Sequence, residues 1–321
     1  MAGTEAQFQA VVDALKAAQR VCIITHLRPD ADAVGSASAL ALGLDQLGKE
    51  STIVIGQRRP VSENLLTIPG SERIQLASSL PDNYDVYVTV DCGAIDRTGL
   101  LEDDVATVDN LVCIDHHSSN TGFGSINLVL DECESTTVVV TRVLDMLSVQ
   151  LDTKIAHGLY AGLMTDTGSF RWGRPAMHMY AHRYMQYGLD TKQIAVELID
   201  STNADDLQMV GRVLSGLRIL PAGPHHLGIL VASLDLTEGS AEGSVESLVD
   251  FVRALDGSDI GVVFKEQSRG VWAVSLRSST VNCAELAGRL GGGGHVPAAG
   301  YTAYGDEGEI INQLVTLLAE E

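Results

Sequence analysis

The sequence is poor in basic residues, with 21 Lys and Arg against 42 Asp and Glu and a formal net charge of −21. Affinity for long nucleic acids depends on cations that neutralise phosphates, so an acidic chain repels a long strand. Screening confines this repulsion to about 8 Å at cellular salt. The charge therefore argues against long duplex nucleic acid as a partner. It is compatible with a short nucleotide held by metal ions and a few local arginines.

Cysteines and aromatic residues are also scarce. The five cysteines include no CxxC pair, which argues against both a disulfide framework and a structural zinc site. With only five phenylalanines, the chain shows no series of aromatic side chains on which a long single strand could stack. The shortage of aromatic side chains thus argues against long single strands as substrates.

Long apolar runs are missing as well, since none approaches the roughly 20 residues that span a bilayer. The N-terminal segment carries acid early and keeps Phe8, Val11, Val12 and Leu15 at helical spacing, which predicts an amphipathic helix and not a signal peptide. We therefore expect a cytoplasmic protein without a membrane partner.

The length of 321 residues predicts two domains. In the N-terminal part, helical patterns alternate with short Val- and Ile-rich runs at 21–26, 51–56, 85–91 and 111–117. Apolar runs without alternation are typical of strands buried on both faces of a parallel sheet. The pattern predicts an α/β fold with a doubly wound, largely parallel sheet.

The C-terminal part begins again with a predicted strand at 227–235, followed by a helix and two adjacent strands. This order predicts a smaller α+β domain. A helical pattern over 203–220 and a Pro/Gly-rich break at 221–226 precede it. We place the domains at 1–200 and 225–321, joined by a mainly helical connection at 201–224.

Polar side chains gather where three of the N-terminal strands end. These residues are His26, Asp30, Asp32, Asp91, Asp115, His116 and His117. Because ligands of such sheets bind at the carboxyl ends of the strands, we expect these side chains to share one edge. Core packing alone does not account for three strands that deliver polar residues to the same edge.

Five of these residues, taken with Asp166 of the MTDTGSFR segment, supply two imidazoles and four carboxylates. The candidate ligands are His26, Asp30, Asp32, Asp91, His116 and Asp166. Two divalent ions with a bridging carboxylate could use so many acids, and mixed N and O donors favour Mn²⁺ while leaving Mg²⁺ or other ions open. Two such ions can stabilise both the attacking and the leaving oxygen of a phosphoryl displacement. Alternatively, Asp30 and Asp32 cap a helix and the other acids close separate turns.

The ordered motifs HxxPDxDxxGS, VDCG, DHHxxN and TDTGSFR resemble those of the DHH phosphoesterase superfamily. The later LRSS and GGGGHVPAAG segments resemble the DHH-associated domain of its oligoribonuclease and RecJ-like branch. Within that branch the chain is most similar to the nanoRNase and 3′-phosphoadenosine-phosphate phosphatase group, which includes enzymes that cleave cyclic di-AMP or pApA. A homodimer is compatible with the resemblance.

The resemblance implies a role for each motif residue. His26 and Asp30 would hold one ion, Asp32, His116 and Asp166 the other, and Asp91 would bridge them. His117 would assist the leaving oxygen, with Asp115 orienting the histidines. The implied substrate-binding residues are Asn120, Arg171, Arg277, Ser278, Gly293, Gly294 and His295. The glycine run would let backbone N–H groups approach an anion, and Arg277 would offer a planar fork to phosphate.

The expected function is a two-metal phosphoesterase working in the cleft between the domains. It would cleave nanoRNA, dinucleotides and pApA to mononucleotides, and cyclic di-AMP is a further possible substrate. It would also convert 3′-phosphoadenosine 5′-phosphate (pAp) to AMP. A RecJ-like single-strand exonuclease is the alternative, although it would normally add nucleic-acid-binding modules. A family II pyrophosphatase would lack the glycine-rich His295 segment. A non-catalytic nucleotide sensor would have lost metal ligands.

Overall fold

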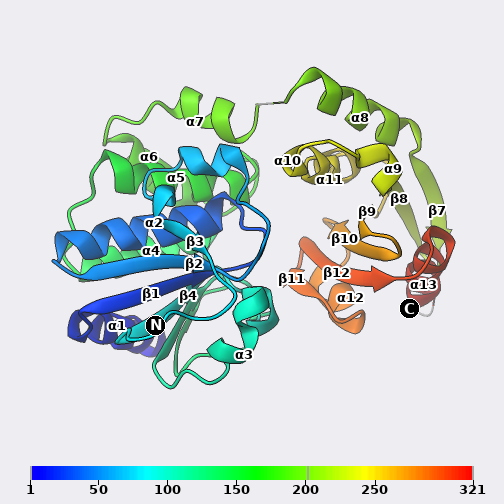
Figure 1. The fold of residues 1–321 in the computed structure, drawn as a ribbon. Helices are drawn as coiled ribbons and strands as arrows, with labels where there is room; N and C mark the ends of the chain where they lie inside the picture. The colour runs from blue at the N-terminus through cyan, green and yellow to red at the C-terminus, as the bar shows by residue number, and fades with distance from the viewer. Residues whose placement is uncertain (1, 201, 320–321) are drawn as a thin grey trace. The chain divides into compact units, whose positions relative to one another are not determined.

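The computed structural model describes residues 2–200 and 202–319. They form two compact units, Met1–Ser201 and Thr202–Glu321, each built around its own sheet (Figure 1). Among the described residues, no helix is both long and apolar enough to cross a membrane.

The first unit contains a six-stranded sheet in the order β3-β2-β1-β4-β5-β6, and every pair in it is parallel. The strands are β1 (Arg20–Thr25), β2 (Glu50–Ile55), β3 (Ile74–Leu76), β4 (Val86–Val90), β5 (Leu111–Asp115) and β6 (Ile126–Val129). The predicted parallel sheet is confirmed. The two edge strands, β3 and β6, were not predicted.

Helical segments cover both faces of this sheet. They are α1 (Ala2–Ala17), α2 (Ala31–Gln46), α3 (Glu102–Val105), α4 (Thr136–Met146), α5 (Thr153–Asp166), α6 (Ala176–Met185), α7 (Thr191–Leu198), η1 (Glu63–Thr67), η2 (Ser71–Arg73) and η3 (Ile95–Leu101). Successive residues of β1 face opposite sides, so that Ile23 joins the core formed with α1, α2, α4 and α5. Ile24 packs instead with Leu101 and Val105 of η3 and α3. The sheet is therefore doubly wound, as predicted.

The second unit contains a six-stranded mixed sheet in the order β11-β12-β10-β9-β8-β7. Its strands are β7 (Arg218–Ala222), β8 (His225–Ala232), β9 (Ile260–Ser268), β10 (Val271–Arg277), β11 (Gly293–His295) and β12 (Ala298–Tyr304). Its helices are α8 (Ala204–Ser215), α9 (Leu234–Thr237), α10 (Glu242–Glu246), α11 (Leu248–Arg253), α12 (Cys283–Arg289) and α13 (Glu307–Ala319). Helices α12 and α13 pack on one face, while α8 and α11 pack on the other. The predicted α+β domain is present.

We predicted a mainly helical connection at 201–224, but residues 202–224 belong to the second unit. The predicted helix over 203–220 ends at Ser215, and β7 begins at Arg218. Strand β7 then pairs with β8 in an antiparallel hairpin that turns at Gly223, where φ is 57°. The helix packs on the second sheet through Met209 and Val213, because a helix with one apolar face must bury it.

Candidate metal centre

The candidate site lies where the strand order of the first sheet reverses, between β1 and β4. Ligands of doubly wound sheets bind in the crevice at such a point, beyond the carboxyl ends of the strands. His26 follows β1, Asp91 follows β4, and His116 follows β5. All three side chains are buried, at 7%, 2% and 4% exposure. The sheet thus brings together the strand-end residues that the sequence predicts.

Asp91 lies between two imidazoles and presents one carboxylate oxygen to each. Its Oδ2 is 3.5 Å from Nε2 of His26, and its Oδ1 is 3.7 Å from Nε2 of His116. The backbone turns sharply here, with φ at 59°, a left-handed conformation that costs a non-glycine residue on the order of 1–3 kcal/mol. This turn redirects the chain immediately after β4 and sets the direction of the Asp91 side chain.

The remaining predicted ligands complete two adjacent groups that share Asp91. Donor atoms of His26, Asp30 and Asp91 lie within 4.8 Å of one another, as do those of Asp32, Asp91 and His116. Asp166 joins the second group, because its Oδ2 is 3.1 Å from Nε2 of His116. The structure therefore brings all six predicted ligands into one cluster.

Backbone carbonyls set the orientation of both imidazoles. Nδ1 of His26 lies 2.9 Å from the oxygen of Leu27, and Nδ1 of His116 lies 3.2 Å from the oxygen of Cys133. In both rings Nε2 therefore faces the carboxylates. Metal-binding histidines have this arrangement, with one nitrogen on the metal and the other donating to a carbonyl or carboxylate.

Helix starts hold two of the carboxylates. Oδ1 of Asp30 accepts the N–H groups of Asp32 and Ala33, both at 3.0 Å, and caps α2. Asp32 accepts the N–H groups of Thr136 and Thr137 at the start of α4, at 2.6 and 2.9 Å. The capping alternative thus holds for Asp30, which also lies 3.9 Å from Nε2 of His26. A helix-capping role does not exclude a ligand role.

Glycines allow α2 and α5 to approach closely enough to place Asp32 and Asp166 in the same cluster. A Cβ on Gly35 would lie 2.3 Å from the carbonyl oxygen of Gly158. A Cβ on Gly162 would lie 2.6 Å from Oδ1 of Asp32. Because Asp166 is the last residue of α5, the close packing of the helices delivers its carboxylate to the site.

The carboxylates oppose one another's ionisation. Burial, with the charge of Asp166, raises the pKa of Asp32 to about 7. Burial and the surrounding aspartates raise the pKa of Asp91 well above its usual value, and burial also raises that of Asp166. Buried carboxylates in a shared site need positive charge before all can be ionised.

The two imidazoles of this cluster differ in their electrostatic surroundings. Burial lowers the pKa of His26 to about 4, which keeps this ring neutral as a metal ligand must be. Burial opposes protonation of His116 too, but the hydrogen bond and charge of Asp166 prevail and raise its pKa to about 10. A divalent cation could take the place of that proton among the same carboxylates. The donor set therefore fits divalent cations that accept both nitrogen and oxygen ligands.

His117 and Asp115 form a hydrogen-bonded pair beside this cluster. Nδ1 of His117 is 2.8 Å from Oδ1 of Asp115, which is fully buried. Burial opposes ionisation of Asp115, but hydrogen bonds from His117 and Asn120 keep its pKa below the usual value. Asp115 thereby orients the His117 ring.

Asn120, predicted to bind substrate, forms hydrogen bonds within the protein. Its Nδ2 donates to Oδ2 of Asp115 at 2.7 Å and to the oxygen of Cys92 at 3.0 Å, and its Oδ1 accepts from Gly122 N. These bonds occupy both ends of the amide. We therefore assign Asn120 to the support of Asp115.

Two residues beside the ligands were not predicted from the sequence. The hydroxyl of Thr136 donates to Oδ1 of Asp91 at 2.8 Å, and Nη2 of Arg97 lies 3.2 Å from Nδ1 of His26. Thr136 carried a weak signal, since a Ser-Thr-Thr run precedes an apolar helical pattern. Arg97 lies in η3 and carried no signal, because its proximity to His26 arises only from the fold.

Arg171 lies on the turn that follows α5. The preceding Gly168, Ser169 and Phe170 all have positive φ, at 53°, 62° and 63°. Nε of Arg171 donates to the oxygen of Gly168 at 2.6 Å, and its guanidinium lies 4.9 Å from the ring of Trp172. The side chain is exposed. The turn thus places an exposed cation five residues after Asp166.

The predicted residues of the second unit lie at one end of its sheet. Arg277 ends β10, and burial lowers its pKa. The hydroxyl of Ser278, predicted to bind substrate, donates to the oxygen of Asp259 at 2.6 Å and accepts from Val281 N at 2.9 Å. These hydrogen bonds close the turn that follows β10.

The glycine run was expected to let backbone N–H groups approach an anion. Gly293, Gly294 and His295 form the edge strand β11, paired with β12. At Gly294, φ is 140° and a Cβ would lie 2.7 Å from the oxygen of Ala298. Close strand packing therefore accounts for Gly294.

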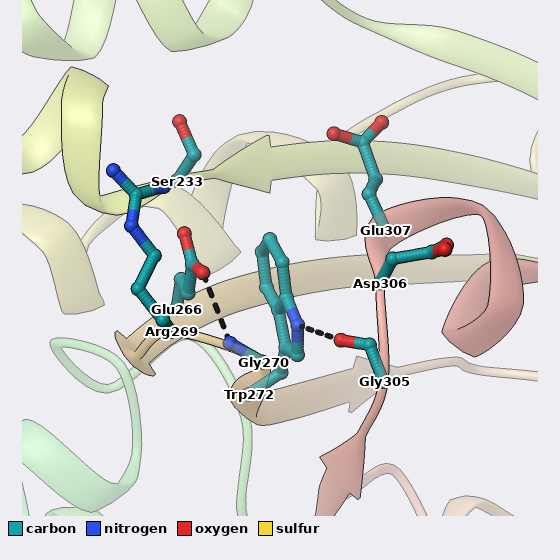
Figure 2. Close-up of a pocket in the computed structure, with 8 residues that line it drawn as sticks. All are labelled: Ser233, Glu266, Arg269, Gly270, Trp272, Gly305, Asp306 and Glu307. Atoms are coloured by element: carbon teal, nitrogen blue, oxygen red, sulfur yellow. Dashed lines mark hydrogen bonds between the residues drawn. The ribbon is translucent and has the colours of Figure 1, made fainter.

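A separate pocket of about 360 Å³ opens in the second unit (Figure 2). Its wall includes Trp272, whose Nε1 donates to the oxygen of Gly305 at 3.1 Å, and Glu266. The Glu266 carboxylate accepts the N–H groups of Leu234 and Gly270. None of the predicted site residues lines this pocket, and its hydrogen bonds are those of a strand end.

Comparison with known proteins agrees with this geometry. Residues 20–163 match the DHH family, N-terminal domain, and residues 227–320 match the DHHA1 domain. The bifunctional oligoribonuclease and PAP phosphatase NrnA of Thermus thermophilus is 30% identical, over 98% of this chain and 94% of that protein. The cyclic-di-AMP phosphodiesterase GdpP of Geobacillus thermodenitrificans is 24% identical, over 90% of this chain and 45% of that protein.

A solved structure shows the same fold. The exopolyphosphatase-related protein of Bacteroides fragilis superposes with a TM-score of 0.82 at 22% sequence identity, covering 99% of this chain and 98% of that one. Together with the two matched domains and the relative that aligns along nearly the whole chain, this fold settles the classification. The chain belongs to the DHH family, with a DHH domain followed by a DHHA1 domain.

Proposed function

We propose that the protein is a two-metal phosphoesterase for very short substrates. It hydrolyses dinucleotides and short oligonucleotides such as pApA to mononucleotides and converts pAp to AMP, with cyclic di-AMP as a further candidate. The observation that carries the proposal is Asp91, whose two oxygens face imidazoles of two donor groups at 3.5 and 3.7 Å. The names of the Thermus and Geobacillus relatives support phosphoester chemistry on such substrates.

The ligand assignment follows the two groups that share Asp91. His26 and Asp30 would hold one cation, Asp32 and His116 would hold the other, and Asp91 belongs to both groups. Asp166 joins the second cation, supported by its 3.1 Å approach to His116. The mixture of carboxylates and imidazoles favours Mn²⁺, with Mg²⁺ as the principal alternative.

Two divalent cations in such a site lower the pKa of water and neutralise charge that develops on the phosphate oxygens. The six ligand side chains set the separation and the charge of this centre. His117 donates a proton to the leaving oxygen, held in position by the 2.8 Å contact of its Nδ1 with Asp115. Asp115 keeps the ring orientation through the reaction.

We assign the contacts to substrate phosphate and sugar to arginine side chains of an otherwise acidic chain. Arg171 is exposed on the turn after α5, and Arg277 ends a strand of the DHHA1 domain. We assign the terminal phosphate of the substrate to Arg277 and His295, with the backbone of Gly293 and Gly294 beside them. Arg277 suits this role because its planar fork can donate two hydrogen bonds to phosphate. The excess of 42 acids over 21 bases disfavours longer strands.

A parallel turnover assay tests the substrate class. The purified protein is supplied with Mn²⁺ and, separately, with pAp, pApA, cyclic di-AMP, an unphosphorylated dinucleotide and a 20-mer. We expect the short substrates to be hydrolysed with a much higher kcat/KM than the 20-mer. Preference for the 20-mer would overturn the short-substrate proposal. Tight nucleotide binding with no turnover of any substrate would favour the sensor alternative.

Two variants test the chemistry. His116→Ala and Asp91→Asn should each abolish turnover at any substrate concentration, because each removes a donor from the cluster. Asp145→Asn is the matched control, since Asp145 forms an exposed ion pair with Arg183 on the surface of the same unit. His295→Ala should mainly raise KM. If either ligand variant keeps near wild-type activity with Mn²⁺, the two-metal assignment is wrong.

A further inference from the structure

Thr136, the first residue of α4, contacts two of the proposed ligands. Its hydroxyl donates to Oδ1 of Asp91 at 2.8 Å, and its backbone N–H donates to Oδ2 of Asp32 at 2.6 Å. The residue is fully buried. We infer that Thr136 is a positioning residue whose hydroxyl fixes the Asp91 carboxylate in the orientation that bridges two cations. This inference rests on the proposed function, since it concerns the same pair of cations.

The Asp91 carboxylate needs such a constraint because its backbone sets only the direction of the side chain. The final torsion of an aspartate is broad, so the two oxygens can rotate about the Cβ–Cγ bond with little resistance. Only one range of rotation points Oδ2 at His26 while Oδ1 points at His116. A hydrogen bond to Oδ1 from a fixed donor selects that range.

Thr136 is such a fixed donor. A threonine is β-branched and has few χ1 rotamers, and this one is held in the first turn of α4. An ionised carboxylate oxygen has lone pairs for both a hydroxyl donor and a cation, so the hydrogen bond and metal binding are compatible. Removal of such supporting hydrogen bonds typically weakens metal affinity or activity by about 10–100-fold.

Thr141 provides a matched control on the same helix. It is equally buried, and its hydroxyl donates to the oxygen of Thr137 at 2.8 Å and pairs with the Tyr184 hydroxyl at 2.6 Å. Neither of these partners is a proposed ligand. Thr141→Val therefore removes a buried hydroxyl from α4 without touching the metal cluster.

The experiment measures Mn²⁺ binding by titration calorimetry and the apo unfolding temperature, in wild type, Thr136→Val, Thr136→Ser and Thr141→Val. We expect Thr136→Val to weaken Mn²⁺ binding by about 10–100-fold. Thr136→Ser should restore binding to within about three-fold, because it keeps the hydroxyl. Thr141→Val should lower the unfolding temperature and leave Mn²⁺ affinity unchanged.

The outcomes separate this inference from the proposed function. Wild-type affinity in Thr136→Val would overturn the inference, and so would equal losses in Thr136→Ser and Thr136→Val. Absence of Mn²⁺ and Mg²⁺ binding by the wild type would instead refute the two-metal proposal itself. If Thr136→Val does not fold, as judged by circular dichroism, Thr136→Ala replaces it under the same criteria.

Discussion

A methyl group added at Gly162 is the sharpest perturbation that the structure offers. Gly162 lies in α5, and a Cβ at this position would be 2.6 Å from Oδ1 of Asp32, 2.7 Å from Cγ2 of Thr137 and 2.8 Å from Cα of Asp32. Non-bonded carbon atoms normally pack at about 3.5–4.0 Å. In Gly162→Ala, α2 and α5 must therefore separate, and the Asp32 carboxylate must shift by about 1 Å.

The expected effects on stability and on turnover differ in size. Overpacking typically costs about 1–3 kcal/mol, whereas alanine in a helix interior is about 1 kcal/mol better than glycine. The free energy of unfolding should thus fall by about 0–2 kcal/mol. A displacement of about 1 Å at a reacting centre can lower turnover by about 100-fold. Activity should therefore be lost from a protein that still folds.

The loss of activity is measured as turnover of pAp at increasing Mn²⁺ concentration. The loss of stability is measured by urea unfolding of the metal-free protein. Gly211→Ala in α8 is the control, because a Cβ there meets no atom within 4 Å. It should leave turnover unchanged and stabilise the protein by at most about 1 kcal/mol. If Gly162→Ala keeps wild-type turnover and Mn²⁺ dependence, Asp32 does not take part in the site as proposed.

Two further predictions concern the metal-free protein and its response to ions. Burial and Asp166 raise the pKa of Asp32 to about 7, so the folded state keeps a proton that the unfolded chain releases above pH 3.8. The wild-type free energy of unfolding should therefore fall from pH 4 to pH 7 relative to that of Asp32→Asn. Denaturant titrations at each pH measure this difference, and the same pH dependence in both proteins would contradict the prediction. Mn²⁺ at 100 times its Kd should stabilise the wild type by about 2.7 kcal/mol for each occupied site, an effect that EDTA reverses and calorimetry detects. No thermal shift in the wild type would contradict the metal site.

The strongly patterned parts of the fold could be predicted from the sequence. The four predicted N-terminal strands are Val- and Ile-rich runs buried in the middle of a parallel sheet, where both faces select apolar residues. Strands β3 and β6 escaped prediction because they are short edge strands of three and four residues. Only Leu128 of β6 is fully buried, so neither strand carries a strong apolar signal.

The candidate ligands could be predicted because acidic and imidazole side chains are unusual at the ends of buried strands. The hydrogen-bonding partners of nearby motif residues could not be predicted. Asn120 follows the DHH motif, but its bond to the oxygen of Cys92 depends on the adjacent strand β4. Ser278 follows Arg277, but its bond to Asp259 depends on a turn that precedes β9. Thr136 shows the converse, since a residue with only a weak signal in the sequence reaches Asp91 through the packing of α4. Motif position indicates proximity to a site, and only tertiary contacts decide what the side chain does there.

The way in which the acids are held explains how the cluster can exist before a cation binds. Asp32 is fully buried among other carboxylates, and its two oxygens accept N–H groups from the start of α4. Helix N-termini carry partial positive charge, so α4 offsets part of the repulsion that raises the Asp32 pKa. The offset is incomplete, because the pKa of Asp32 still lies near 7. The fold therefore holds the candidate ligands in fixed positions with their negative charge only partly compensated, a condition that favours binding of divalent cations.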